Sequence, residues 1–129
     1  MKLEEFRKIL IAEKYLKSWT NSGTKWEWNE DWSVDVFGSV CTLPSDKFDK
    51  LPFKFHKVYG FFNCGYNDLK TFENCPDEIT GSFCCYANNF TSLKHVPMIV
   101  EKDFAIHNDV FTEEEVRKHC KIGEKYSGI

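Results

Sequence analysis

The most reactive side chains in this 129-residue chain are six cysteines, and their spacing limits the chemistry that they can support. They are Cys41, Cys64, Cys75, Cys84, Cys85 and Cys120. No two of them form the Cys-x-x-Cys pair that is typical of zinc ribbons and of thioredoxin-like redox sites. Charges interrupt every apolar run near the N-terminus, so no secretion signal is predicted. We therefore expect a cytoplasmic protein with free thiols.

Cys84, His107 and Asp103 could form a nucleophilic site if the chain folds into stacked rows. A thiolate beside an imidazole that a carboxylate orients is an arrangement used in covalent catalysis. A shallow face of short strands offers no enclosed pocket and no oxyanion donors, so the sequence predicts no enzyme. Cys41, Cys84 and His107 share a face without tetrahedral spacing, so we expect no metal and no cofactor.

Residues 47–57 alternate cations with aromatic rings and offer a different chemistry. They read Lys-Phe-Asp-Lys-Leu-Pro-Phe-Lys-Phe-His-Lys, and a second basic cluster follows at 117–121. Such a composition suits single-stranded RNA, whose bases stack on aromatic rings. It is equally typical of a solvated loop and of a helix C-terminus. A formal net charge of -3 excludes a strongly basic, non-specific nucleic-acid binder. Single-stranded RNA binding is therefore an alternative function.

The elements that position these residues follow from an internal repeat of about 21 residues. Residues 58–78 and 79–99 align as two rows, and a third row begins at 100. The matched columns are Val58, Ile79 and Val100; Phe62, Phe83 and Phe104; Cys64, Cys85 and Ile106; Asn67, Asn88 and Asp109; and Leu69, Phe90 and Phe111. Because side chains alternate along a strand, positions 58, 60, 62 and 64 are predicted to face the core.

The turns and an earlier, degenerate row complete the pattern. Asn67 and Asn88 fall where the chain leaves the strand, and a short amide there can bond the turn backbone and adopt a left-handed conformation. Val36, Gly38 and Val40 match the columns of Val58, Gly60 and Phe62. Ser45 is the residue nearest to the missing asparagine of this first row.

Two rows read Phe62-x-Cys64-x-x-Asn67-x-Leu69-x-x-Phe72 and Phe83-x-Cys85-x-x-Asn88-x-Phe90-x-x-Leu93. This pattern resembles the short form of the leucine-rich repeat. Over about residues 34–122 the chain resembles small proteins of tailed phages and bacteria whose rows read G-x-F-x-C-x-x-N-x-L-T-S-L-x-x-x-P. The resemblance implies an α+β fold, a short leucine-rich-repeat-like β-solenoid of three or four stacked strands. It also implies a protein that modulates or inhibits a bacterial host protein.

A single domain, residues 1–129, is predicted in three parts. The cap at 1–33 begins with a helix over about 2–19, whose apolar stripe is Leu3, Phe6, Ile9, Leu10, Leu16 and Trp19. Trp26, Trp28 and Trp32 then suggest strands that cover the first row, with an exposed aromatic platform as the alternative. The repeat stack spans 34–111. Thr112 begins a capping helix over 112–122, in which Glu115 completes a capping box.

The outward strand face is the predicted binding surface. Its candidate residues are Phe37, Tyr59, Phe61, Cys84, Tyr86, Asp103 and His107. Exposed rings are costly unless they are used, and aromatic anchors dominate interfaces, so we expect a protein partner centred on Tyr59, Phe61, Tyr86 and His107. A self-associating structural protein, in which a second copy forms a homodimer through this face, is the other alternative. No apolar run approaches transmembrane length, so no membrane partner is expected.

Overall fold

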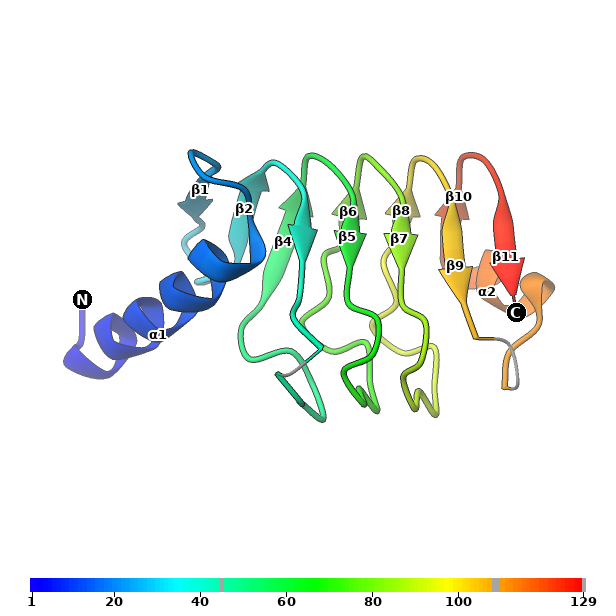
Figure 1. The fold of residues 1–129 in the computed structure, drawn as a ribbon, viewed down its shortest axis with the longest axis horizontal. Coiled ribbons are helices and arrows are strands. Elements are labelled where there is room, and N and C mark those ends of the chain that lie inside the picture. The colour runs from blue at the N-terminus through cyan, green and yellow to red at the C-terminus, as the bar shows by residue number, and fades with distance from the viewer. Residues whose placement is uncertain (45, 108–109, 129) are drawn as a thin grey trace.

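The repeats form a β-solenoid of stacked coils in the computed structural model, which describes residues 1–44, 46–107 and 110–128 (Figure 1). Each coil contributes one short strand to each of two sheets. The first sheet contains, in spatial order, β1 (Lys25–Trp28), β2 (Val34–Phe37), β4 (Phe55–Val58), β6 (Glu78–Ile79), β8 (Ile99–Val100) and β10 (Lys121–Ile122). The second contains β3 (Val40–Cys41), β5 (Phe62–Asn63), β7 (Phe83–Cys84), β9 (Phe104–Ile106) and β11 (Tyr126–Gly128). β1 pairs antiparallel with β2, and the neighbouring coils pair in parallel.

The register between coils confirms the repeat alignment. Val36, Val58, Ile79 and Val100 are consecutive pairing partners in the first sheet. In the second sheet Phe62 pairs with Phe83, and Phe83 pairs with Phe104. These three rings are fully buried, with centroid separations of 6.1 and 5.2 Å along the stack. Burial of each ring stabilises the fold by about 1.5–3 kcal/mol, so this column is the centre of the core.

The strands are shorter than the alternation over positions 58–64 predicts, because the rows that begin at Val58 and Ile79 bend at Gly60 and Gly81. The strands end at Val58 and Ile79, and the next strands begin at Phe62 and Phe83. A Cβ atom on Gly81 would lie 2.7 Å from the carbonyl group of Gly60 in the preceding coil. Only glycine permits this approach of two backbones. The outward surface is therefore folded around a corner.

The stack also continues beyond its predicted end at residue 111. Helix α2 (Glu113–His119) is followed by β10 and β11, which pair with β8 and β9 as a further coil. The N-cap is confirmed, because Thr112 Oγ1 accepts the backbone N–H of Glu115 at 3.1 Å. Val116 inserts into the core, so α2 takes the place of a return loop between two coils.

The asparagines form the predicted ladder along one edge of the stack. Asn88 Oδ1 accepts the backbone N–H groups of Asn67 and Leu69, at 3.1 and 2.9 Å. Its Nδ2 donates to the carbonyl oxygen of Cys64 at 2.9 Å. Each asparagine side chain therefore joins its own coil to the preceding one and satisfies backbone groups of the turn.

The conformations within these turns differ from the prediction. The left-handed backbone occurs at the preceding residues, Tyr66 (φ 63°) and Ala87 (φ 53°), instead of at the asparagines. In the first row Thr42 accepts a hydrogen bond from the Asn67 side chain. Ser45 and Asp109, which were assigned to this column, lie outside the described residues.

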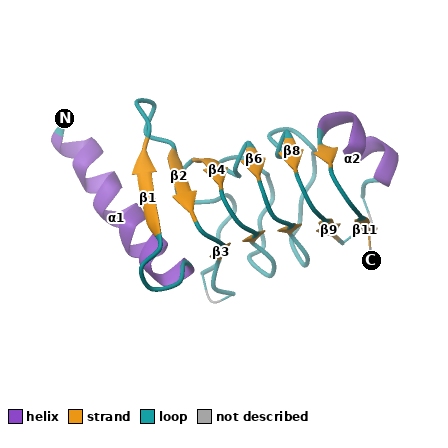
Figure 2. Cartoon of the chain, turned by 90° about the horizontal axis from the view of Figure 1, so that it is seen from above, coloured by secondary structure: helices purple, strands orange, loops and turns teal. Residues whose placement is uncertain are grey.

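Helix α1 (Leu3–Trp19) lies across the N-terminal end of the stack, and α2 lies near the other end (Figure 2). Leu16 and Trp19 of α1 are buried. The Glu13 carboxylate accepts hydrogen bonds from the indole N–H groups of Trp26 and Trp28, at 3.0 and 3.3 Å. Both indoles pack against the core, as the covering interpretation required. Of the helices in the described residues, neither has the length and apolar character needed to cross a membrane.

Candidate functional site

The seven predicted binding residues lie on different parts of the folded surface. Phe37 and Tyr59 lie at the ends of neighbouring strands of the first sheet, Phe61 lies just past Gly60, and we call these three residues the corner aromatic cluster. Cys84 and Asp103 belong to later coils of the second sheet. Tyr86 and His107 lie at the far end of the second sheet, on later coils. Positions 61 and 86 differ by one coil and by four positions along the strand, or about 13 Å. The predicted centre of Tyr59, Phe61, Tyr86 and His107 is therefore not one contiguous cluster.

The corner aromatic cluster is held by regular packing beneath it. Because Val36 pairs with Val58, Phe37 lies beside Tyr59, and their rings stack with centroids 5.0 Å apart and planes 15° apart. The Phe61 N–H donates to Ser39 Oγ at 3.0 Å and fixes the other side of the corner. The three aromatic residues, Phe37, Tyr59 and Phe61, remain 44%, 42% and 47% exposed.

A cation extends this cluster. The Lys57 ammonium lies 4.8 Å from the centroid of the Tyr59 ring, within the range of a cation–π contact. The cluster therefore presents three apolar rings and one positive charge on a backbone held by two sheets. Such a surface can bury aromatic area and accept a carboxylate from a partner.

The three residues of the predicted nucleophilic arrangement have separate structural partners. His107 Nδ1 accepts the backbone N–H of Ala87 at 2.9 Å, which requires that this nitrogen carry no proton. Asp103 Oδ1 accepts the N–H of Lys125 at 3.0 Å, in the next coil. Burial raises the pKa of the Cys84 thiol, and a smaller effect of nearby Cys41 acts in the same direction, so the reactive thiolate is disfavoured.

No cluster of three His, Cys, Asp or Glu side chains among the described residues could hold a metal ion. Cys41 and Cys84 do share a column, but Asn63 lies between them on the intervening coil. Adjacent strands are about 4.8 Å apart, so the two thiols cannot bind one ion. All six cysteines are free thiols, four of them buried.

The cationic segment 47–57 is tied to the next coil by a row of ion pairs. The pairs are Lys47–Asp68 (3.7 Å), Lys50–Glu73 (3.0 Å), Lys54–Asp77 (2.9 Å) and Lys70–Asp49 (3.8 Å). Lys50 lowers the pKa of the Glu73 carboxyl by a hydrogen bond and by its charge. Phe55 is fully buried, and Phe48 and Phe53 pack against the core. The rings that would stack on bases are therefore occupied by the protein itself.

A second exposed apolar surface was not predicted as a site. The first turns of α1 extend past the stack, so that Leu3, Phe6 and Leu10 are 65%, 49% and 47% exposed (Figure 1). Of the apolar stripe predicted for the capping helix, Leu16 and Trp19 in the C-terminal half are buried. A helix of 17 residues is about 25 Å long, whereas two packed sheets are about 10 Å apart. The length of the predicted helix was therefore the feature of the sequence that could have indicated an uncovered segment.

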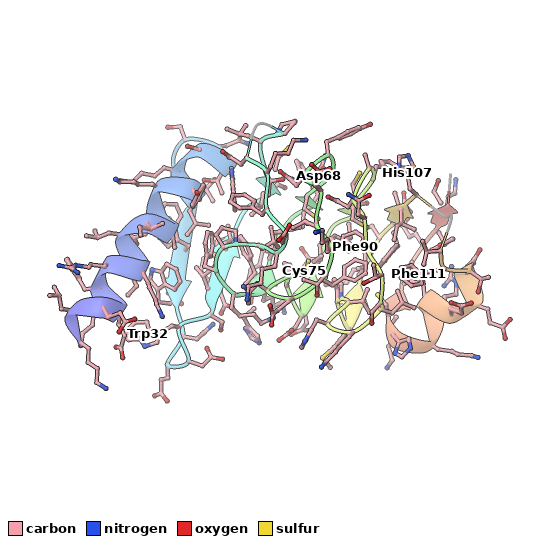
Figure 3. The ribbon with its side chains drawn as sticks, turned by 90° about the horizontal axis from the view of Figure 1, so that it is seen from below. Trp32, Asp68, Cys75, Phe90, His107 and Phe111 are labelled. Atoms are coloured by element: carbon pink, nitrogen blue, oxygen red, sulfur yellow. The ribbon has the colours of Figure 1, made fainter. Side chains whose placement is uncertain are left out.

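A groove lies on the other side of the same part of α1. It has a volume of about 570 Å³ and is lined by Ile9, Ala12, Trp28, Trp32 and Phe53, among others. Trp32 lies near the N-terminal part of α1 (Figure 3). It is 37% exposed and has a left-handed backbone (φ 64°), which is costly for a large side chain. Of the three tryptophans assigned to the cap, this one is left at the surface.

The chain matches none of the protein-family models, curated proteins or solved structures with which it was compared. The fold is therefore defined by its own geometry, as a β-solenoid of about four turns with one helix near each end. What the protein does has to be argued from the surfaces that this solenoid presents.

Proposed function

We propose that the protein is a non-enzymatic protein-interaction module of the leucine-rich-repeat-like type, which binds a bacterial host protein and modulates or inhibits it. The observation that carries the proposal is the corner aromatic cluster, three rings that are 42–47% exposed on a rigid stack. Aromatic anchors of this kind dominate the energetics of interfaces. A preformed surface also loses little conformational entropy when it docks. The resemblance of the repeat rows to phage proteins is the reason for proposing a bacterial partner.

The chemistry of the polar residues favours binding over catalysis. The Cys84 thiol has a raised pKa, His107 accepts a backbone hydrogen bond, and Asp103 is bonded to another coil. His107 and Asp103 each accept a hydrogen bond from a backbone N–H group. Among the described residues, these hydrogen bonds do not join the three side chains to one another. A nucleophile needs an adjacent base and a third group that orients it.

The single-stranded RNA alternative has less support from the geometry. Its lysines lie in ion pairs with the acids of the next coil, and Phe55 is fully buried. Binding to single strands requires accessible rings and uncompensated positive charge. Self-association through the corner aromatic cluster uses the same residues as the proposal, so the experiment must separate the two.

The test compares capture by the natural chain with capture by a variant that carries Phe37→Ser, Tyr59→Ser and Phe61→Ser. The control variant carries Tyr66→Ser, Met98→Ser and Val110→Ser, which remove apolar side chains of comparable exposure elsewhere. Each tagged protein is incubated with bacterial lysate, with and without nuclease treatment, and captured proteins are identified by mass spectrometry. A specific prey is then purified, and its affinity for all three chains is measured by calorimetry.

We expect the corner variant to lose at least about tenfold in affinity and the control variant to keep it. Equal binding of a purified prey to the natural and corner chains would contradict the proposal. Capture that nuclease abolishes would favour the RNA alternative instead. A dimer in sedimentation velocity that the corner variant dissolves, with no prey, would favour self-association.

A further inference from the structure

The outer face of α1 carries an apolar stripe that the solenoid does not cover. Leu3, Phe6 and Leu10 follow one another at spacings of three and four residues, which places them on one side of a helix. They lie away from Leu16 and Trp19, the residues that α1 buries against the stack. We call these three residues the α1 stripe. Met1, which is 76% exposed, lies at its N-terminal end.

The α1 stripe is narrow and has the spacing of a helix-pairing seam. A helix face that covers a globular core is at least about 100° wide, whereas a seam with apolar residues at spacings of three and four is narrower. α1 packs on the solenoid through a wider face, formed by Ala12, Tyr15, Leu16 and Trp19. The narrow stripe on the other side therefore has the shape that a second helix, and not a sheet, would cover.

Positive charge flanks the α1 stripe on one side and at its C-terminal end. Arg7 and Lys14 flank the α1 stripe on one side. Lys17 lies seven residues after Leu10, on the same side of the helix as the stripe. All three cations are exposed, and the ion pairs formed within residues 1–44, 46–107 and 110–128 leave them out. Glu13, the carboxylate nearest to the stripe, is turned toward the indoles of Trp26 and Trp28. Residues 1–19 thus carry five cations and three carboxylates, in a chain whose net charge is -3.

From this charge and shape we infer that the α1 stripe is a second docking surface, distinct from the corner aromatic cluster. Its partner is an amphipathic helix of another protein, with an apolar seam flanked by carboxylates. Two such helices pack at 8–10 Å, and acidic side chains beside the seam then reach Arg7, Lys14 and Lys17.

The same observations argue against two other occupants. A second copy of α1 would place cations of like sign beside one another, which is unfavourable in a helix pair. A membrane-surface helix needs a wide apolar face. On α1 that face is used against the solenoid, and Glu4 and Glu5 add negative charge near the N-terminus.

The docked state would also order the start of the helix. Lys2 is the N-cap residue of α1, and its side chain makes no capping hydrogen bond. Short helical segments without tertiary packing are marginal in water, and residues 3, 4, 6, 7 and 8 are all exposed. A partner helix along the α1 stripe would supply the missing contacts. Amide exchange of the first two turns should therefore slow when the partner binds.

The experiment uses the full chain and a synthetic helical peptide of about 20 residues with a leucine seam and glutamate flanks. A twin peptide with lysine in place of each glutamate is the charge control. Binding is measured by calorimetry for the natural chain, for Leu3→Gln/Phe6→Gln/Leu10→Gln and for Arg7→Glu/Lys14→Glu. Circular dichroism verifies that each variant is folded. The corner variant described above is the matched control for a change elsewhere on the surface.

We expect the natural chain and the corner variant to bind the acidic peptide at least about tenfold more tightly than its twin. The glutamine variant should lose that binding, and the glutamate variant should prefer the lysine twin. Equal affinity for both peptides, or binding that survives the glutamine changes, would overturn the inference. So would α1-dependent adsorption to phosphatidylserine-containing vesicles without peptide binding, or an α1-dependent dimer in sedimentation velocity. Loss of peptide binding in the corner variant would place the site elsewhere.

Discussion

At the scale of single residues, the interior phenylalanine column and the exposed corner phenylalanine test how burial translates into stability. Phe83 is fully buried between Phe62 and Phe104, while Phe61 is 47% exposed. Phe83→Ala should lower the free energy of unfolding by about 3–5 kcal/mol, because it removes a buried ring and leaves a cavity. Phe61→Ala should change it by less than about 1 kcal/mol. Urea denaturation measures both, and similar losses for the two variants would contradict the interior column.

The buried thiols predict how stability depends on alkaline pH. Burial raises the pKa of Cys120 to about 11, and it raises the pKa of Cys64 and Cys85 well above the ordinary value of 9.0. In the unfolded chain these thiols ionise near pH 9, whereas in the folded chain they stay protonated. Their contribution to stability is therefore complete below about pH 9 and is lost as the pH rises from about 9 toward 11.

Thermal unfolding in the presence of a reductant should show this loss as a fall in Tm between pH 8.5 and 10.5. Cys120→Ala should have a shallower fall than the natural chain, because one ionising thiol is removed. Cys41→Ala, at an exposed thiol, is the control and should leave the slope unchanged. A Cys120→Ala profile parallel to that of the natural chain would show that this thiol does not contribute.

At the scale of the elements, the Asn turns add contacts between neighbouring coils to those that the short strands make. Asn88 accepts two backbone N–H groups of the preceding coil, from Asn67 and Leu69. Asn88→Ala leaves both donors without that partner, and an unsatisfied buried group costs about 1–3 kcal/mol. We expect a total loss of about 2–4 kcal/mol in urea denaturation. Asn89→Ala, at the exposed neighbour, should be close to neutral, and an equal loss there would contradict the ladder.

Much of this element structure could be predicted from the sequence because each coil repeats the same contacts. The Val58, Phe62 and Asn67 columns fixed the register, the core and the turn. The corner could not be seen, because a bend at Gly60 leaves the in–out alternation of its neighbours unchanged. Lys121–Ile122 and Tyr126–Gly128 were missed for another reason. Helix α2 precedes this coil in place of a return loop, so the proline that closes the other rows is absent.

The candidate sites were predictable to a different extent. Exposure of Tyr59 and Phe61 followed from strand alternation, but their separation from Tyr86 and His107 depended on the unseen corner. The apolar periodicity of α1 showed which side of the helix is apolar. It could not show what that side contacts, because contact depends on the width of the stack end. The sequence showed only that this helix is longer than the stack is thick.

At the scale of the whole molecule, a solenoid is stabilised by contacts between nearest coils, so its two ends should respond differently to truncation. The last coil covers Phe104, whose ring stacks on Tyr126 at 5.9 Å, and it completes both sheets. Residues 1–8, in contrast, are exposed or partly exposed and contribute no buried residue to the core. The two ends are therefore unequal in energy, although each carries a helix.

Deletion of residues 121–129 should lower the free energy of unfolding by about 3 kcal/mol or more, because it uncovers the end of the phenylalanine column and opens two strand edges. Deletion of residues 1–8 should cost less than about 1 kcal/mol. Urea denaturation of both chains measures the difference, and a larger loss for the N-terminal deletion would show that the first turns of α1 support the stack. If the N-terminal deletion costs little, the apolar residues in the first turns of α1 do not stabilise the monomer. The stable N-terminal deletion would then separate the two surfaces, because it removes Leu3 and Phe6 of the α1 stripe and leaves the residues of the corner aromatic cluster in place.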